Sequence, residues 1–83
     1  MQKWNSFKTW FDNHPAGTLV KLRLDANVSV SFDGLGDTKR TPTGHVGIVI
    51  GFIDRDMWGP VAAVFINDVV GFFREPMIHL EKV

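Results

Sequence analysis

The sequence predicts a mainly β fold: a small five-stranded antiparallel barrel or roll with one short N-terminal amphipathic helix. Residues 20–32 alternate apolar and polar side chains, which is the pattern of a half-buried strand. Further short apolar runs follow, and the links between them are too short for helical crossovers, so neighbouring strands must run antiparallel. Eighty-three residues have room for one core. We therefore expect a single domain, 1–83, with the helix at 3–13 and the barrel at 17–83.

The helix is predicted from aromatic spacing near the N-terminus. At 100° per residue one stripe of about a third of the circumference holds Trp4, Phe7, Trp10 and Phe11. Pro15 ends the helix, because proline disfavours helical geometry at the residue before it. A helix this short is unstable alone, so its stripe either closes the core or docks onto a partner. Core closure is favoured, on an open barrel end or the glycine-bearing face of 44–52, because an open end exposes apolar interior.

The first strand stretch, 20–32, is longer than most natural strands. Either the strand bends at Asp25-Ala26-Asn27, which we prefer, or a turn there folds it into two. Residues 33–43 contain Gly, Pro and several charges and are predicted to form a loop. Residues 44–53 are apolar on both faces, which is typical of a central strand covered on both sides.

Two further strands are predicted at 61–66 and 69–73. Asn67 and Asp68 between them tolerate positive φ, which favours a two-residue hairpin. Residues 77–83 are expected to supply a short turn and a last strand.

Several of these segments resemble the small Src-homology-3-like barrels, including the translation-associated barrels with a Gly-x-Val/Gly-x-Val strand. The similarity covers roughly 17–83 and depends on Gly44, Val46, Gly47, Val49, Val64, Phe65, Asp68, Leu80, Glu81 and Val83. The "LE-x-V" ending is also similar to short barrels of tailed-phage genomes, which implies a phage origin and the host cytoplasm. The aromatic helix is an addition to such a barrel.

Composition narrows the function classes. Nine basic residues balance nine acidic ones, which disfavours a dedicated nucleic-acid binder and permits self-association. Without Cys there is neither a disulfide nor a zinc–sulfur site, as suits the cytoplasm. The longest apolar run has eight residues, too few to span a bilayer, and we expect no signal peptide and no membrane partner.

No catalytic or metal-binding motif is recognisable. His14, His45 and His79 are not at ligand spacing, and the acidic loop from Asp33 lacks the ligand positions of a calcium loop. No nucleophile-elbow motif is present, and a barrel of this size has little room for a pocket. We therefore expect no enzyme activity, no cofactor and no metal.

The expected function is a non-enzymatic interaction module that binds a protein partner or self-assembles. The partner-binding candidates are Arg55, Met57 and Trp58 on a predicted turn, and Trp4 and Trp10 on the helix. Trp58 either projects outward or folds onto Pro60 and the sheet.

The alternative is a nucleic-acid-binding barrel of the translation or transcription type. Its candidate cations are Lys21, Arg23, Lys39 and Arg40, and Trp58 beside Arg55 would offer a stacking platform. Acidic residues interspersed among these cations favour an ordinary solvated surface.

Overall fold

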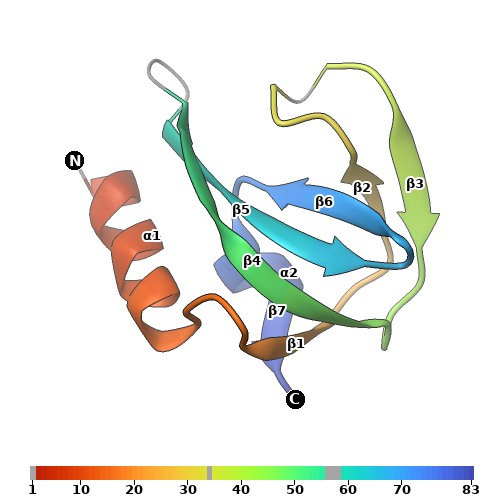
Figure 1. The fold of residues 1–83 in the computed structure, drawn as a ribbon, viewed down its shortest axis with the longest axis horizontal. Helices are drawn as coiled ribbons and strands as arrows, with labels where there is room; N and C mark the ends of the chain where they lie inside the picture. The colour runs from red at the N-terminus through yellow and green to blue at the C-terminus, as the bar shows by residue number, and fades with distance from the viewer. Residues whose placement is uncertain (1, 34, 56–58) are drawn as a thin grey trace.

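The computed structural model describes residues 2–33, 35–55 and 59–83. Its elements are α1 (Gln2–Asn13), β1 (Leu19–Leu22), β2 (Ala26–Ser29), β3 (Thr38–Thr41), β4 (Val46–Arg55), β5 (Gly59–Ile66), β6 (Val69–Phe73), α2 (Pro76–His79) and β7 (Leu80–Lys82). Within those residues the strands form one antiparallel sheet of seven, in the order β3-β2-β6-β5-β4-β1-β7 (Figure 1). The mainly β fold with an N-terminal helix is confirmed. The finer expectation of a five-stranded barrel or roll is not matched, because the described residues form seven strands and the sheet is open, with β3 and β7 at its edges.

The sheet is strongly curled. Only residues 23–25 separate β1 from β2, yet β1 lies between β4 and β7 while β2 lies between β3 and β6. A connection of three residues can join such distant strands only if the sheet bends around on itself. The first and second strands are not paired with each other. The alternating stretch therefore changes direction without forming a hairpin. The interruption lies at residues 23–25, whereas the bend was expected at Asp25-Ala26-Asn27, and Ala26 and Asn27 already belong to β2.

β3 corrects the prediction of an uninterrupted loop at 33–43. Its residues, Thr38–Thr41, pair with β2 in the register Ala26↔Thr41 to Ser29↔Thr38. Thr41 is buried, and the rest of the strand is half-buried or exposed. An edge strand needs few apolar residues and is commonly protected by charged ones. The polar sequence of β3 therefore shows no alternation of apolar and polar residues from which a strand could be predicted.

The hairpin between β5 and β6 is confirmed. Asn67 and Asp68 have φ values of 54° and 66°, as a type I′ turn requires. β6 occupies the predicted residues. Near the C-terminus, the expected short turn is the helical turn α2, which begins at Pro76, and the expected last strand is β7. Proline suits the first helical position.

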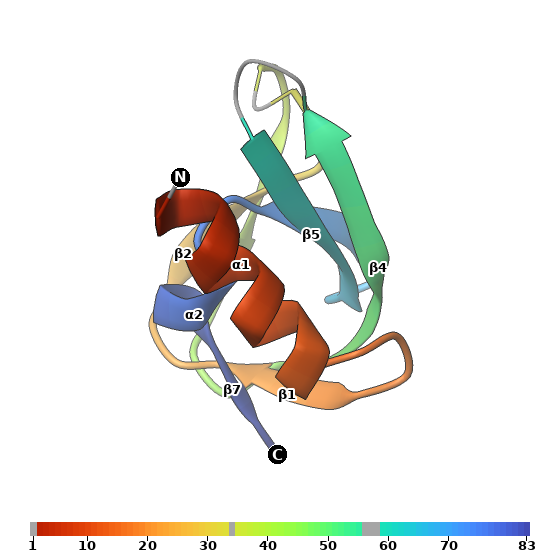
Figure 2. The ribbon, with the colours of Figure 1, turned by 90° about the vertical axis from the view of Figure 1, so that its left-hand side faces the viewer.

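The core lies on the concave side of the sheet, and α1 covers its open part. The buried cluster contains Phe7, Trp10, Val20, Leu22, Val28, Val49, Ala62, Val64, Ile66, Phe73 and Leu80. α1 packs against β5 and α2 (Figure 2). The Phe52 ring of β4 lies 5.9 Å from the Phe7 ring and 4.9 Å from the Phe11 ring, both edge to face. Phe7 and Trp10 of the predicted stripe thus belong to the buried core, and Phe11 packs against it.

The glycines of β4 do not form the seat predicted for α1. A Cβ on Gly47 would meet Val64 and Ile66 of β5, and one on Gly51 would meet nothing within 4 Å. The close approach at Gly47 therefore comes from the neighbouring strand. α1 contacts β4 through the large ring of Phe52 instead.

β4 is covered on one side only, so the expected doubly covered strand is wrong for this chain. Val49 is buried in the concave core, whereas Val46, Ile48 and Ile50 remain 53%, 39% and 49% exposed. α1 lies on the concave side, and among residues 2–33, 35–55 and 59–83 no helix or strand covers Val46, Ile48 and Ile50 on the convex side of β4.

Candidate protein interface

Four apolar side chains form a row across the convex side of the sheet. The pairing registers place Leu19 of β1 opposite Ile48 of β4, Ile48 opposite Phe65 of β5, and Phe65 opposite Val70 of β6. Directly paired residues of an antiparallel sheet project to the same face. These four side chains are 52%, 39%, 46% and 38% exposed, in that order. They form a continuous apolar row perpendicular to the strands.

A β-bulge widens this row along β4. The register shifts between Val49 and Gly51, so Ile50 and Gly51 together oppose Ala63. Ala63 lies two residues before Phe65, on the same face, and this places Ile50 on the convex side as well. Val46 lies two residues before Ile48 and is also exposed. We call Leu19, Val46, Ile48, Ile50, Phe65 and Val70 the outer apolar face.

Aromatic side chains continue the apolar surface towards β2. Phe72 pairs with Ala63 and therefore lies on the convex side of β6. The exposed ring of Phe32 lies 6.5 Å from the Phe72 ring, edge to face. The apolar surface thus reaches beyond β6 to the segment after β2.

One ion pair borders the outer apolar face beside β1. Lys21 lies opposite Val46 and opposite Glu81 of β7. The Lys21 Nζ and Glu81 Oε1 atoms are 3.9 Å apart, with both side chains about half exposed. These two charges compensate each other, so this border carries little net field.

The sequence-predicted partner residues fall in different places. Met57 and Trp58 lie outside the described residues, and of Arg55 and Trp4 only the backbone is described, at the end of β4 and within α1. Trp10 is 6% exposed and belongs to the core. Its ring stacks on His14 at a centroid distance of 4.4 Å, and His14 Nδ1 lies 2.8 Å from the Trp10 carbonyl oxygen. Trp10 therefore closes the core in this structure.

The four candidate cations have local surroundings that differ from those of a phosphate-binding patch. Lys21 pairs with Glu81, Arg40 Nη2 lies 3.3 Å from Asp25 Oδ2, and Lys39 Nζ donates to the Asn67 carbonyl at 2.7 Å. Arg23 lies in the bend after β1 and is exposed. β1 and β3 also lie in separate parts of the sheet order. The structure therefore does not gather these cations on one strand face.

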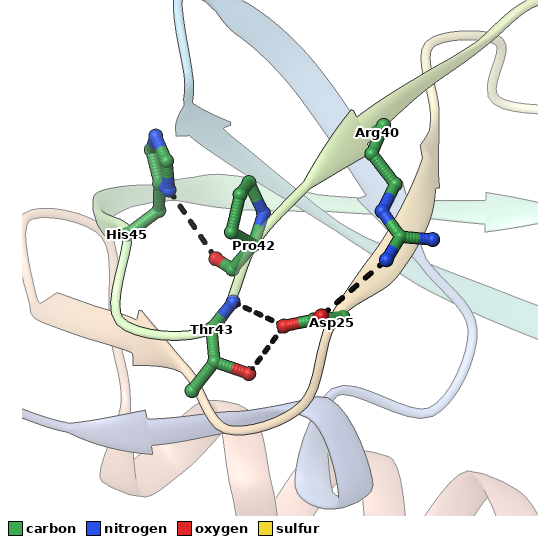
Figure 3. Close-up of polar contacts among 5 residues, drawn as sticks. All are labelled: Asp25, Arg40, Pro42, Thr43 and His45. Atoms are coloured by element: carbon green, nitrogen blue, oxygen red, sulfur yellow. Dashed lines mark hydrogen bonds and ion pairs between the residues drawn. The ribbon is translucent and has the colours of Figure 1, made fainter.

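A polar cluster organises the corner between β3 and β4 (Figure 3). Asp25 Oδ1 accepts hydrogen bonds from the Thr43 backbone N–H and the Thr43 hydroxyl, both at 2.7 Å. The Thr43 hydroxyl, then the Thr43 N–H, and then the Arg40 charge lower the pKa of the exposed Asp25 carboxyl below its ordinary 3.8. Beside it, His45 Nδ1 lies 3.2 Å from the Pro42 carbonyl oxygen. Asp25 holds a turn in place, and the cluster resembles a structural cap rather than a catalytic site.

A small cavity of about 240 Å³ lies between β2, the end of β6 and α2. Its lining includes His79, whose buried Nδ1 has no hydrogen-bond partner among the described residues, together with Arg74 and Glu75. The cavity is below the ~300 Å³ of a typical small-molecule site. Within 2–33, 35–55 and 59–83, no three metal-ligating side chains come together. No helix in those ranges is long and apolar enough to cross a membrane.

The sequence analysis did not name the outer apolar face. The sequence did contain one indication of this face. Residues 44–53 are apolar on both sides, but the single short helix predicted from the sequence could cover only one side. Ile48, Phe65 and Val70 could be aligned into one row only after the register was known.

Comparisons with protein-family models, with curated proteins and with solved structures find no match to this chain.

Proposed function

We propose that this protein is a non-enzymatic interaction module that binds a protein through its outer apolar face. The row Leu19–Ile48–Phe65–Val70 carries the proposal, because four half-exposed large side chains stand in direct register across four strands. Scattered surface apolar residues are normal, but a contiguous apolar patch usually marks an interaction site. The proposal also includes two expectations from the sequence: a relationship to the small Src-homology-3-like barrels and a cytoplasmic location.

Two physical arguments favour a protein as the ligand. The outer apolar face is built from four adjacent strands, so it suits another extended surface. Its Phe, Ile and Leu side chains are the kind that lose water favourably at the centre of an interface. The neighbouring Lys21–Glu81 pair supplies a polar border, as interface rims commonly do.

Nucleic-acid binding is the alternative function, based on Lys21, Arg23, Lys39 and Arg40. Phosphate binding requires cations that are free to replace counterions. Lys21, Lys39 and Arg40 each already contact an acidic group or a carbonyl oxygen. The six residues of the outer apolar face are uncharged, and Lys21 beside them is paired with Glu81.

The test compares two isoleucines with similar exposure at different sites. Ile48 lies in the outer apolar face at 39% exposure, and Ile78 lies on α2 at 47%. Immobilised wild-type protein, Ile48→Lys and Ile78→Lys are used to capture proteins from cells of the source organism, with quantitative mass spectrometry as readout. We expect a protein, including this chain itself, to be retained by wild type and Ile78→Lys but lost from Ile48→Lys. If Ile48→Lys and Ile78→Lys retain the same proteins equally well, the outer apolar face is not the binding surface.

A further inference from the structure

The outer apolar face carries an inference about its occupant, which rests on the proposed function. We propose that the occupant is a second copy of this chain, packed face to face about a two-fold axis that passes between Ile48 and Phe65.

The order of the row is suited to a two-fold axis. Leu19, Ile48, Phe65 and Val70 follow one another on adjacent strands, at intervals of about 4.8 Å. A two-fold axis that lies in the plane between the two sheets, parallel to the strands and midway between Ile48 and Phe65, brings Ile48 of one copy over Phe65 of the other. It also brings Leu19 of one copy over Val70 of the other. An axis through either end of the row would leave the opposite end in water, so the midpoint buries the most apolar surface.

The exposed area fits a dimer at the small end of the stable range. Burying a large apolar side chain removes on the order of 100 Å² from water. Ile53 pairs with Val61, two residues before Ala63, and so lies on the same side of the sheet. The six residues of the outer apolar face, Phe32 and Ile53 are each about two-fifths to one-half exposed, so complete burial of all eight would remove about 350 Å². A small stable interface takes about 600 Å² from each partner, somewhat more than half of it apolar, or about 350 Å². The face therefore reaches the area of a small stable dimer when all eight of these residues are covered.

The charges do not oppose such a pairing. The chain has nine basic and nine acidic residues and therefore no net charge. The Lys21–Glu81 pair beside the face is internally compensated. Two identical copies can approach without the long-range repulsion that a charged chain would have. A strongly charged partner, by contrast, would find no complementary field at this face.

Two packed sheets also provide the cover that β4 lacks. Sheets stack about 10 Å apart with their apolar side chains between them, and their twist sets the strands of the two layers about 30° apart. In the dimer the convex sides of β4 and β5 become the inner layer of a sandwich. The apolar character of both faces of residues 44–53 then has a physical reason.

Sedimentation equilibrium on the full chain measures the association directly. We expect the average mass to rise from the 9.3 kDa of one chain towards twice that value between about 1 µM and about 1 mM, the range of moderate affinities. Ile48→Lys should weaken the association at least tenfold, because it buries an unpaired charge at the axis. Ile48→Thr, which keeps a β-branched side chain, should weaken it to a smaller extent. Ile78→Lys should leave it unchanged.

Cross-linking tests the position of the axis. The chain contains no Cys, so single Cys variants give no background with a bis-maleimide of about 10 Å reach, the spacing of packed sheets. Ile48→Cys mixed with Phe65→Cys should form a cross-linked dimer, and so should Leu19→Cys mixed with Val70→Cys. Leu19→Cys alone should not, because its two copies lie at opposite ends of the row.

The outcomes separate this inference from the proposed function. A chain that stays monomeric at about 1 mM, or that cross-links efficiently through Leu19→Cys alone, overturns the dimer. If that monomer still retains another protein in a manner that Ile48→Lys abolishes, the proposed function stands and only the occupant is wrong. If retention is also unaffected by Ile48→Lys, both proposals fall.

Discussion

The side-chain amide of Asn67 donates hydrogen bonds to the Thr41 hydroxyl oxygen at 3.3 Å and to the Arg40 carbonyl oxygen at 3.2 Å. Asn67 belongs to the β5–β6 turn, and Thr41 is the buried last residue of β3. In addition, Lys39 of β3 donates a hydrogen bond from Nζ to the Asn67 carbonyl oxygen. These bonds tie an edge strand to a turn that is not its neighbour in the sheet order, and so they hold the curl of the sheet.

The turn offers a matched pair of substitutions. Asn67→Gly and Asp68→Gly both relieve a positive φ and both add chain entropy to the unfolded state. Only Asn67→Gly removes the two side-chain bonds to β3, each worth about 0.5–1.5 kcal/mol. We expect Asn67→Gly to be about 1–2 kcal/mol less stable than Asp68→Gly in urea unfolding. Equal stabilities would mean that the Asn67 amide does not hold β3.

Two strand glycines are expected to respond in opposite directions to alanine. A Cβ on Gly71 would collide with Val28 Cγ1, a core side chain, while a Cβ on Gly51 would meet nothing within 4 Å. Gly71→Ala should therefore cost about 1–3 kcal/mol by overpacking. Gly51→Ala should be neutral or stabilising by about 0.5 kcal/mol, because alanine loses less entropy on folding. Thermal unfolding of both variants checks the pair, and a destabilised Gly51→Ala alone would contradict the geometry.

Removing the Phe7 ring should test how α1 supports the fold. Phe7 is 2% exposed in the core and contacts Phe52, so Phe7→Ala is expected to cost about 3–5 kcal/mol. The neighbouring Lys8 is exposed on the same helix, and Lys8→Ala should change stability by less than about 0.5 kcal/mol. A Phe7→Ala protein as stable as Lys8→Ala would show that the sheet is stable without α1.

The Asp25 carboxyl should make stability fall in acid. Its pKa is lowered below 3.8, first by the Thr43 hydroxyl, then by the Thr43 N–H and the Arg40 charge. The stabilisation is therefore fully present above the unfolded-state value and is lost as the pH falls through the lower folded-state value. Asp25→Asn and Thr43→Ala should both reduce the acid dependence of the melting temperature. If the melting temperatures of Asp25→Asn and Thr43→Ala change with pH in parallel with wild type from about pH 2 to pH 6, this linkage is wrong.

The salt dependence of the affinity should distinguish protein association from nucleic-acid binding. Association through the outer apolar face buries few unpaired charges, so its dissociation constant should change less than about threefold between 0.05 and 0.5 M salt, well beyond the range in which exposed charges are screened. Binding to nucleic acid releases counterions, and its affinity should then fall by orders of magnitude over about the same range. A mobility shift at low salt that disappears on adding salt would favour the nucleic-acid alternative.

Particular residues show where sequence reasoning succeeded. The period-two pattern of residues 20–32 predicted a half-buried strand, and Val20, Leu22 and Val28 are buried in β1 and β2, whereas Leu24 and Phe32 are exposed and lie outside these strands. Asn67-Asp68 correctly marked the hairpin, because the turn signal is local. The Phe7 and Trp10 stripe indicated a helix that had to pack, and both rings are in the core. β3 was missed because Thr41 is its single buried residue, so its strand character depends on backbone pairing with β2.

The sequence by itself determined the local elements of this protein: strands from alternation, a helix from an aromatic stripe, and a turn from two residues that accept positive φ. Tertiary structure decided the number of strands, the open edges at β3 and β7 and the identity of the uncovered face. The physical reason is that burial is a property of pairs of elements. The apolar residues on both sides of β4 are alike in the sequence, and only the placement of α1 on the concave side leaves Ile48 and Phe65 facing water.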